Sequence, residues 1–502
     1  MPRTLLYAAL ASCVLAQACT PDAPAPAPLS DLALVPLPAE ISSGEGQLDV
    51  RHVEARDVTP ALVEYVDGNR WLVGDVEAAD PTPLAIQLDA ALGAEAYRLD
   101  VTEANVVLTG GDAAGAYYGL QTLRQLLGEA RAGTGTLAVG RIDDRPRYGY
   151  RGVMLDVSRH FHQPEEIRRV IELMSHYKMN VLHLHLTDDQ GWRIEIKSWP
   201  KLTEVGGSTQ VGGEGGGFLT QEEYEDLVAF AKTRHVTIVP EVDLPGHTQA
   251  ALASYPELNC NPKDPDPQLY EGTEVGFSTL CIGKPVVMEF VGDVIRELAA
   301  ITPGPYLHLG GDESWSTDSM EYRAFMSDAE AVVRANGKRA IAWDEFATAE
   351  ADESAVVQYW HSAENVKLAR AAGRKLIMSP AHRAYLDMQY DSTSRIGLHW
   401  AAYISPEHGY TWDPATEVEG VTDADILGVE APLWSETVVT REDIDYLMFP
   451  RLLGYAEIGW TPADKREWGA YAKRLAVQEE WLRGQGVSVE ERISVAKVET
   501  RP

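Results

Sequence analysis

The sequence is poor in basic residues, in cysteine and in long apolar runs, and each shortage excludes a class of protein. It has 43 Lys and Arg against 76 Asp and Glu, a formal net charge of −33. Such a chain repels a phosphate backbone, so we expect no nucleic-acid partner. Beyond residue 18, no apolar run approaches the roughly 20 residues that span a bilayer. The content of 45% hydrophobic and 24% charged residues is otherwise typical of a globular protein.

Residues 1–18 have the pattern of a secretory signal peptide: Arg3, an apolar stretch over 5–15, and Ala16-Gln17-Ala18 as a small-x-small cleavage pattern. They predict export to the periplasm, the medium or the cell envelope. Cys19 follows directly, but Ala16 stands where a lipobox usually has Leu, so a lipid anchor and free secretion both stay open. Residues 19–38 are rich in Pro and Ala and predict an extended tether.

Of the four cysteines, only Cys260 and Cys281 lie beyond the signal region. One remaining pair in an exported protein predicts a disulfide that closes the Pro- and Asp-rich loop between them. Two free buried thiols are the alternative. The surrounding sequence has no metal-ligand spacing.

The rest of the chain divides into a small domain, a large one and a tail. Residues 39–146 mix an alternating stretch at 96–101 with a helical pattern at 115–127, which predicts a small α+β domain. We find no catalytic constellation in it. Residues 147–485 form the main domain and 486–502 a C-terminal tail.

The main domain repeats a short apolar run followed by a helical pattern eight times. The runs are Tyr150–Asp156, Asn180–Thr187, Val236–Val242, Tyr306–Leu309, Arg339–Trp343, Ala355–Trp360, Lys375–Ser379 and Ile426–Leu433. Eight strand–helix units predict an α/β fold with a closed (β/α)8 TIM barrel. An open doubly wound sheet competes, but it often has a Gly-rich phosphate turn near its first helix, which is absent here.

Polar and aromatic side chains gather where the predicted strands end, which is where barrel enzymes build their sites. Among them, Asp312 and Glu313 follow an apolar run and two glycines. Two adjacent carboxylates in one cavity can act as acid and stabiliser, because each disfavours ionisation of the other. An Asp-Glu pair on a surface is the plain alternative, and the Gly-Gly turn at a barrel strand end favours the catalytic interpretation.

Other strand-end residues have competing interpretations. His183 and His185 have a spacing that suits zinc, which makes a metal-dependent hydrolase our second hypothesis, but hydrogen-bonded core histidines are favoured because further ligands are not evident. Arg159 suits hydroxyl binding as well as a surface ion pair. Three strand-closing tryptophans suit either a core or a sugar pocket: Trp343, Trp360 and Trp434. The Gly-rich segment 206–217 indicates a mobile loop, with a substrate rim as the alternative interpretation. Residues 380–425 form a longer connection than is usual, which indicates a functional or locally structured loop.

The motifs together resemble family-20 glycoside hydrolases, the bacterial β-N-acetylhexosaminidases. The likeness runs from about Leu34 to the C-terminal region and includes the small domain. Its segments are LDVSRHF at 155–161, LHLHLTDDQGW at 182–192, PEVDLPGH at 240–247, HLGGDE at 308–313, YLDMQY at 385–390 and LWSE at 433–436.

The resemblance implies a role for each matching residue. Glu313 would be the general acid and base, and Asp312 would orient the substrate's 2-acetamido group and stabilise its positive charge. Asp188 and His247 would support Glu313. Tyr385 would bind the acetamido oxygen, while Trp343, Trp360 and Trp434 enclose its methyl group; Arg159, Asp387 and Glu436 would hold the sugar hydroxyls.

The implied reaction is substrate-assisted hydrolysis with retention, in which the acetamide oxygen attacks the anomeric carbon and forms an oxazolinium ion. Asp312 then stays ionised while Glu313 starts protonated. Neither metal nor organic cofactor is implied, and the partners are oligosaccharides or glycoconjugates ending in N-acetylhexosamine. Chitin fragments, glycoproteins and glycolipids all remain open as natural substrates. A carbohydrate-binding module is a third hypothesis, which the Asp-Glu pair disfavours.

Overall fold

The structure is a computed structural model that describes residues 25–68, 80–213, 215–260 and 266–489. The predicted signal peptide, Cys19, the first part of the tether, Glu214 and most of the predicted tail lie outside these residues. Among the residues that are described, no helix is both long and apolar enough to cross a membrane.

The first module is a mixed sheet of six strands in the order β1-β6-β4-β5-β3-β2. The strands are β1 (Glu40–Asp49), β2 (Val53–Val58), β3 (Thr82–Leu88), β4 (Tyr97–Val101), β5 (Val106–Gly110) and β6 (Thr136–Asp144). The alternating stretch at 96–101 becomes β4, whose buried and half-buried side chains alternate. The short helix α1 (Val63–Gly68) follows β2.

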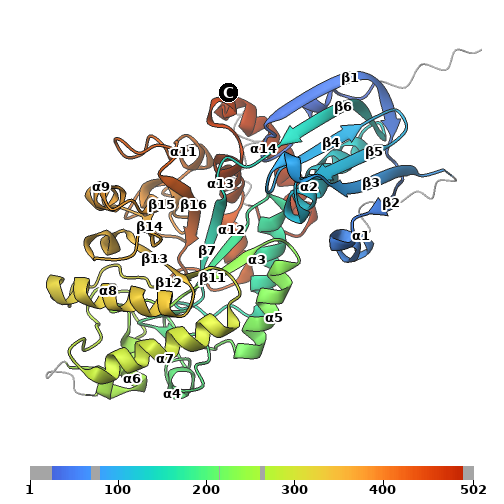
Figure 1. Ribbon diagram of the computed structural model, residues 1–502. Helices are drawn as coiled ribbons and strands as arrows, with labels where there is room; N and C mark the ends of the chain where they lie inside the picture. Colours follow the sequence, from blue (N-terminus) through green and yellow to red (C-terminus); the bar gives the residue numbers. More distant parts are fainter. Residues whose placement is uncertain (1–24, 69–79, 214, 261–265, 490–502) are drawn as a thin grey trace, which may run out of the picture.

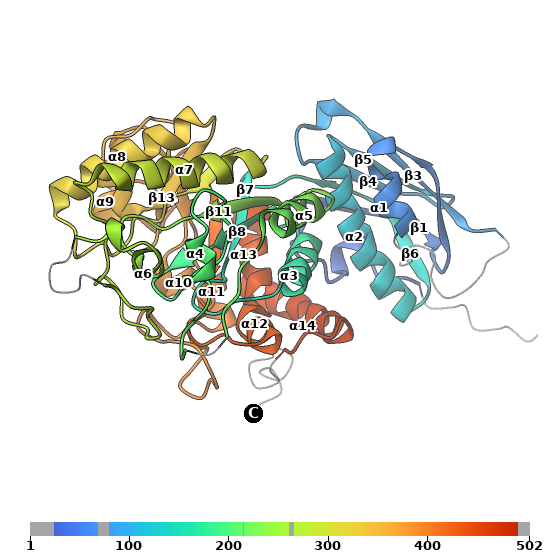
Figure 2. The ribbon, with the colours of Figure 1, turned by 90° about the horizontal axis from the view of Figure 1, so that it is seen from below.

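Helix α2 (Ala113–Ala132) lies between this sheet and the second module (Figure 2). It begins after Asp112, whose carboxylate accepts a hydrogen bond from the Gly115 N–H at 2.7 Å and so caps the helix. Its buried face packs on the sheet, and on the opposite side Tyr117 donates a hydrogen bond to Ser175 of the barrel at 2.9 Å. The predicted α+β arrangement is therefore present.

The second module is a closed barrel of eight parallel strands, as the sequence predicts (Figure 1). Its strands are β7 (Tyr150–Asp156), β8 (Val181–His185), β11 (Thr237–Glu241), β12 (Tyr306–His308), β13 (Arg339–Trp343), β14 (Val356–Tyr359), β15 (Lys375–Met378) and β16 (Ile426–Leu433). The last strand, β16, pairs with β7 and closes the ring. A two-stranded ribbon, β9 (Thr187–Asp188) and β10 (Gly191–Trp192), follows β8.

Helices surround the barrel and cover the outward side chains of its strands (Figure 1). They are α3 (Pro164–His176), α4 (Lys201–Glu204), α5 (Gln221–Lys232), α6 (Gln249–Ser254), α7 (Pro285–Ile301), α8 (Ser319–Ala335), α9 (Ala363–Ala371), α10 (Ala381–Ala384), α11 (Pro406–Tyr410), α12 (Arg441–Met448), α13 (Arg451–Trp460) and α14 (Trp468–Gly484). Because every strand is covered, its sequence is a nearly continuous apolar run.

The barrel interior changes character from one end to the other. An apolar cluster fills the end where the strands begin: Tyr150, Val181, Val239, Ile341, Val356 and Ile377. Charged and aromatic side chains occupy the middle and the carboxyl end of the strands, including His183, Glu241 and Glu430, all fully buried. Branched aliphatic residues usually fill such a barrel. The polar layer therefore needs its own hydrogen-bond partners.

Trp460, at the end of α13, joins the two modules. Its ring belongs to the apolar cluster of the small sheet, and its indole N–H donates to Asp144 of β6 at 3.0 Å. Lys178 donates to the same carboxylate at 3.1 Å and lies 4.6 Å from the Trp460 ring centroid. A charged pair and a tryptophan are thus buried where the sheet meets the barrel.

Candidate active site

A pocket opens at the carboxyl ends of the barrel strands, and eight of the predicted site residues line it. These are Arg159, Asp312, Glu313, Trp360, Tyr385, Asp387, Trp434 and Glu436; the other lining residues are Thr273, Val275, Leu398 and Trp400. The remaining predicted residues lie behind this lining. Asp188 and His247 are buried and contact Arg159, Asp312 and Glu313, and Trp343 packs on Trp434.

The backbone after β12 brings the two adjacent carboxylates into the pocket. Gly310 has φ +65°, and a Cβ added there would lie 1.9 Å from Asp243 Oδ1, so only glycine fits. Asp243 accepts the Gly311 N–H at 2.9 Å and fixes the turn. Glu313 itself has φ +44°. A non-glycine residue in that region carries backbone strain, which clusters at functional sites.

Asp312 lies in a cluster of acids and faces the imidazole of His247. Burial and the neighbouring Glu313 raise the pKa of Asp312, whereas His247 acts in the opposite direction. Burial and Asp312 also raise the pKa of Asp243 well above its usual range, which favours a protonated Asp243 beside Asp312. The site therefore holds fewer negative charges than it has carboxyl groups.

His247 supplies the balancing positive charge. Its Nδ1 lies 3.1 Å from Asp188 Oδ1, and its Nε2 lies 3.7 Å from Asp312 Oδ2 and 3.6 Å from Glu313 Oε2. Burial lowers the pKa of His247, but Asp188 and Asp312 outweigh burial and raise it well above the usual range. An imidazolium thus stands between Asp188 and the catalytic pair that the sequence predicts.

Arg159, Asp387 and Glu436 form a polar patch on the pocket wall. Arg159 pairs with Asp188 Oδ2 at 2.6 Å and lies 4.7 Å from the Trp434 ring centroid. Both oxygens of Asp387 and Oε2 of Glu436 are buried without a hydrogen-bond partner among the described residues. Burial and Glu436 raise the pKa of Asp387 well above its usual range. Buried polar atoms of this kind are suited to the hydroxyls of a ligand.

An aromatic box adjoins the polar patch. Trp343, Tyr385 and Trp434 belong to one buried cluster, with Trp360 packed against it. The Trp343 and Trp434 ring centroids are 5.7 Å apart, and those of Tyr385 and Trp434 are 6.2 Å apart. The indole N–H of Trp360 donates to Glu345 at 3.0 Å, which fixes its ring. The box can enclose a small apolar group next to Asp312.

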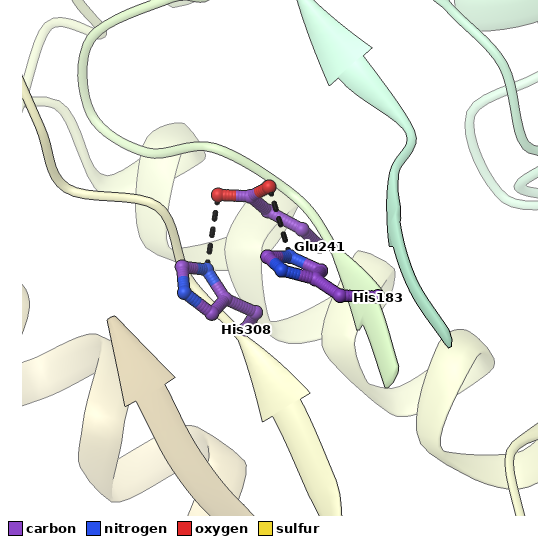
Figure 3. Close-up of side chains that lie close together, drawn as sticks. All are labelled: His183, Glu241 and His308. Carbon is purple, nitrogen blue, oxygen red and sulfur yellow. Dashed lines mark ion pairs between the residues drawn. The ribbon is translucent and has the colours of Figure 1, made fainter. Parts of the chain in front are cut away.

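Below the pocket, His183, His185 and His308 surround Glu241. Figure 3 shows Glu241 between two of them, with His308 Nδ1 at 2.9 Å from Oε1 and His183 Nε2 at 3.0 Å from Oε2. His185 Nδ1 contacts Oε2 as well, and its Nε2 lies 3.0 Å from Asp188 Oδ2. Glu241 thus connects the barrel interior to Asp188.

These contacts bear on the two interpretations of the His-x-His spacing. His183, Glu241 and His308 lie close enough for a metal site, but His183 Nδ1 also faces Glu430 at 2.9 Å. Burial lowers the pKa of His183, yet Glu430 and Glu241 outweigh burial and raise it to about 9. A doubly protonated imidazole has no lone pair for a metal. The carboxylate partners of these imidazoles therefore agree with hydrogen-bonded core histidines.

The Gly-rich segment has defined contacts in the structure. Its described residues, 206–213 and 215–217, lie around Arg193, whose buried guanidinium donates to the carbonyls of Gly207, Thr209 and Gly217. Its Gly212 N–H donates to the Glu271 carbonyl at 2.9 Å. The loop is therefore packed against the segment that carries Thr273 and Val275 into the pocket.

The predicted disulfide is not formed: Cys260 and Cys281 are both free cysteines, the first exposed and the second buried. The expected proximity is present, because the Cys281 N–H donates to the Leu258 carbonyl at 2.8 Å, and burial and the Cys260 thiol raise the pKa of Cys281 to about 11. Proximity alone does not oxidise two thiols, since oxidation depends on the redox compartment as well.

Several residues of the site are absent from the sequence-based prediction. Glu241 and Glu430 lie inside predicted strands, where an acid within an apolar run was the available signal. Trp400, Thr273 and Val275 come from long loops whose path to the pocket has no sequence signature. Asp243 lies in the motif at 240–247, but the sequence-based prediction assigns it no role.

Models of known protein families match both modules of this chain. The model of the glycosyl hydrolase family 20 catalytic domain matches residues 148–463, and that of domain 2 of the same family matches residues 31–145. A β-N-acetylhexosaminidase from Cellulomonas fimi is 38% identical over 466 residues, which cover 89% of this chain and 94% of the relative.

Solved structures of family-20 enzymes superimpose on most of this chain. The family-20 β-N-acetylhexosaminidase from Streptomyces coelicolor A3(2) superimposes with a TM-score of 0.86 at 42% identity, covering 93% of this chain and 99% of that one. A mutant Streptomyces plicatus β-hexosaminidase in complex with its product, GlcNAc, gives a TM-score of 0.86 at 43% identity, with 93% and 97% covered.

Proposed function

Because the chain belongs to glycosyl hydrolase family 20 and is a glycoside hydrolase of the β-N-acetylhexosaminidase type, we propose that it removes terminal, non-reducing N-acetylglucosamine or N-acetylgalactosamine with retention. The substrate's own acetamide would be the nucleophile. The observation that carries this proposal is the aromatic box beside Asp312 and Glu313, together with the unpartnered buried oxygens of Asp387 and Glu436.

In this proposal the polar patch binds the hydroxyls of the terminal sugar. Asp387 and Glu436 accept hydrogen bonds from hydroxyls, and Arg159 donates to a sugar oxygen from a position fixed by Asp188. The high pKa of Asp387 also allows it to donate when protonated. A sugar offers both donors and acceptors, so this mixture of groups suits it.

The aromatic box would hold the acetamide. Trp343, Trp360 and Trp434 surround the methyl group, and Tyr385 donates its phenolic proton to the acetamide oxygen. Asp312 accepts the acetamide N–H, which turns the oxygen toward the anomeric carbon. As that oxygen attacks, positive charge develops on the acetamide, and the ionised Asp312 stabilises it in a site shielded from water.

Glu313 would carry the proton in both steps. In the first, the bond between the anomeric carbon and the leaving oxygen breaks as the acetamide oxygen forms its own bond to that carbon; Glu313 gives its proton to the leaving oxygen. In the second, Glu313 takes a proton from water as the water oxygen attacks the same carbon. The acetamide is released, and two inversions give net retention.

His247 and Asp188 would hold these two carboxylates in their different states. The imidazolium lies within 4 Å of both. Its charge stabilises the ionised Asp312 throughout, and it stabilises the Glu313 carboxylate only after Glu313 has given its proton to the leaving oxygen. Asp188, ionised beside Arg159 and His247, keeps the imidazole protonated.

Metal removal separates this proposal from the metal-hydrolase alternative. We expect activity on an aryl N-acetylglucosaminide to be unchanged after incubation with a chelator such as EDTA and dialysis, because the proposed steps use only side chains and substrate. Initial rates before and after treatment, with added Zn²⁺ or Mg²⁺ as a control, measure this. Loss of activity with recovery on adding a metal would instead support the alternative.

Product analysis tests the proposal as a whole. The protein is incubated with N-acetylhexosamine oligosaccharides of defined length and linkage, and products are followed by mass spectrometry and by NMR of the first-formed anomer. Release of single β-configured N-acetylhexosamines from the non-reducing end is expected. Internal cleavage, an α-anomer, or binding without turnover would contradict it. The same panel ranks chitin fragments against glycoprotein glycans and glycolipid headgroups.

We also propose that residues 1–18 direct export and that the mature protein lies in the periplasm, in the medium or on the envelope, tethered by the Pro- and Ala-rich segment. The signal pattern and Cys19 support this. Mass spectrometry of the mature N-terminus distinguishes a lipid-modified Cys19 from a free one, and an uncleaved N-terminus would contradict export.

A further inference from the structure

Glu241 is a carboxylate in the barrel interior that takes no part in the steps proposed above. It is the last residue of β11, and its side chain is fully buried. Strand pairing places His185 of β8 on one side of it and His308 of β12 on the other. Burial raises the pKa of Glu241, but the neighbouring histidines outweigh burial and lower it well below its usual range. A buried charge of this kind is costly unless both oxygens have partners, so the partners indicate what the carboxylate holds in place.

The Oε1 oxygen of Glu241 contacts the aromatic box. The indole N–H of Trp343 donates to this oxygen at 2.9 Å. Trp343 is buried, and its ring centroid lies 5.7 Å from that of Trp434, which lines the pocket. Because an indole has a single N–H donor, this hydrogen bond fixes the rotation of the Trp343 ring. The carboxylate therefore sets the orientation of one wall of the box.

The Oε2 oxygen connects to the groups that support Glu313. It contacts His185 Nδ1, and His185 Nε2 lies 3.0 Å from Asp188 Oδ2. The other oxygen of Asp188 lies 3.1 Å from His247 Nδ1. Burial lowers the pKa of His185, but Glu241 and Asp188 outweigh burial and raise it to about 10. A protonated His185 donates to a carboxylate at each of its ring nitrogens, so it joins Glu241 to Asp188.

A carboxylate can serve both contacts at once, whereas an amide of the same shape cannot. Figure 3 shows His183 and His308 on either side of Glu241, and Trp343 and His185 approach the same two oxygens. An ionised carboxylate accepts hydrogen bonds through both oxygens, but a glutamine has one acceptor and one donor group. The amide nitrogen would face either Trp343 or His185, and that contact would lose its hydrogen bond.

We propose that Glu241 is a positioning residue for the reaction. Through Trp343 it orients the aromatic box that holds the acetamide. Through His185 and Asp188 it orients the imidazolium beside the two catalytic carboxylates. One buried carboxylate thus fixes the enclosure of the nucleophile and the support of the acid relative to each other, although it does not itself line the pocket. The inference rests on the proposed function.

Glu430 offers a matched control for Glu241. Its side chain is just as buried, and its Oε1 lies 2.9 Å from Nδ1 of His183, which both carboxylates contact. Its other partners are Gln358 at 2.7 Å and Tyr150 at 2.6 Å, and neither lines the active-site pocket. Loss of a buried charge should therefore destabilise both variants, whereas loss of orientation at the active site should affect only the Glu241 variant.

We expect Glu241→Gln to lower kcat on an aryl N-acetylglucosaminide about 10- to 100-fold with a smaller change in KM, because small displacements of reacting groups have effects of this size. Glu430→Gln should lose a similar amount of thermal stability, while its kcat stays within about 3-fold of the parent. Rates are measured well below both melting temperatures, so that every variant is fully folded in the assay.

The acyl group of the substrate gives a readout that a loss of stability does not change. A box that encloses a methyl group should favour an N-acetyl over an N-propionyl glucosaminide by about 10-fold or more in kcat/KM, the effect of one extra methylene in a closed pocket. In Glu241→Gln the Trp343 ring is no longer fixed, so this preference should fall by at least about 3-fold. In Glu430→Gln the preference should keep its parental value.

His185→Gln supplies a second variant if Glu241→Gln does not fold, because it breaks the connection between Glu241 and Asp188. It should lower kcat more than Glu430→Gln does. Equal losses of kcat in the Glu241 and Glu430 variants, a parental acyl preference in Glu241→Gln, or near-parental kcat in His185→Gln would refute the inference. Failure of the proposed function would look different, because the parent enzyme would then hydrolyse neither the N-acetyl nor the N-propionyl substrate.

Discussion

Glu313→Gln should lower kcat on N-acetyl-β-glucosaminides with poor leaving groups by about 10³- to 10⁴-fold, because glutamine cannot protonate the leaving oxygen. The loss should be much smaller for a dinitrophenyl glycoside, whose leaving group departs without a proton. Gln keeps the shape of the side chain, so KM should change little. Initial rates across a series of aryl glycosides of increasing leaving-group pKa measure this dependence.

Glu321→Gln is the control, since Glu321 is an exposed carboxylate on α8 and should retain parental rates. Near-parental turnover in Glu313→Gln would show that another group is the acid. A loss that does not vary with the leaving group would show that Glu313 acts in some way other than proton transfer.

Asp312→Asn should also be severely impaired, by about 10²- to 10³-fold in kcat, the size of effect seen when a group that stabilises transition-state charge is removed. Unlike the Glu313 variant, it should be impaired on dinitrophenyl glycosides as well, because the acetamide oxygen must attack whatever the leaving group. Unchanged kinetics in Asp312→Asn would argue against substrate assistance.

The pH profile gives an independent readout for the same residue. Burial and Glu313 raise the pKa of Asp312, so in the parent kcat/KM should fall with decreasing pH at values above the ordinary aspartate pKa of about 4. The rate falls on acidification because the ionised form of Asp312 is the active one, and this form is lost as the pH drops through the raised pKa of Asp312. Asp312→Asn should lack this acidic limb while retaining its low residual rate.

The barrel could be predicted because its strands are covered on both sides. Each strand is therefore an apolar run, and the predicted runs agree with the observed strands to within two residues at either end, as for Asn180–Thr187 against Val181–His185. Because Asp312, Trp343 and Trp434 lie at or just after the ends of predicted strands, the barrel fold alone predicts that they meet at one rim.

Other features depend on contacts that the sequence does not encode locally. In a fully buried strand most residues on both faces are apolar. The sequence therefore shows Glu241 as an acid within an apolar run, but it does not show that the side chain points into the barrel. The path of the loop that carries Trp400 is set by packing on Tyr385 and Trp360. The order of strands in the small sheet likewise depends on crossovers between distant segments.

The junction at Trp460 has a consequence for the architecture of the enzyme. Its indole completes the core of the small sheet, although its backbone belongs to the barrel. Deleting the small sheet would expose that ring and deprive buried Lys178 of Asp144, so the catalytic barrel would not be left intact. The two modules are therefore separate in sequence but should unfold as one cooperative unit, in a single thermal transition.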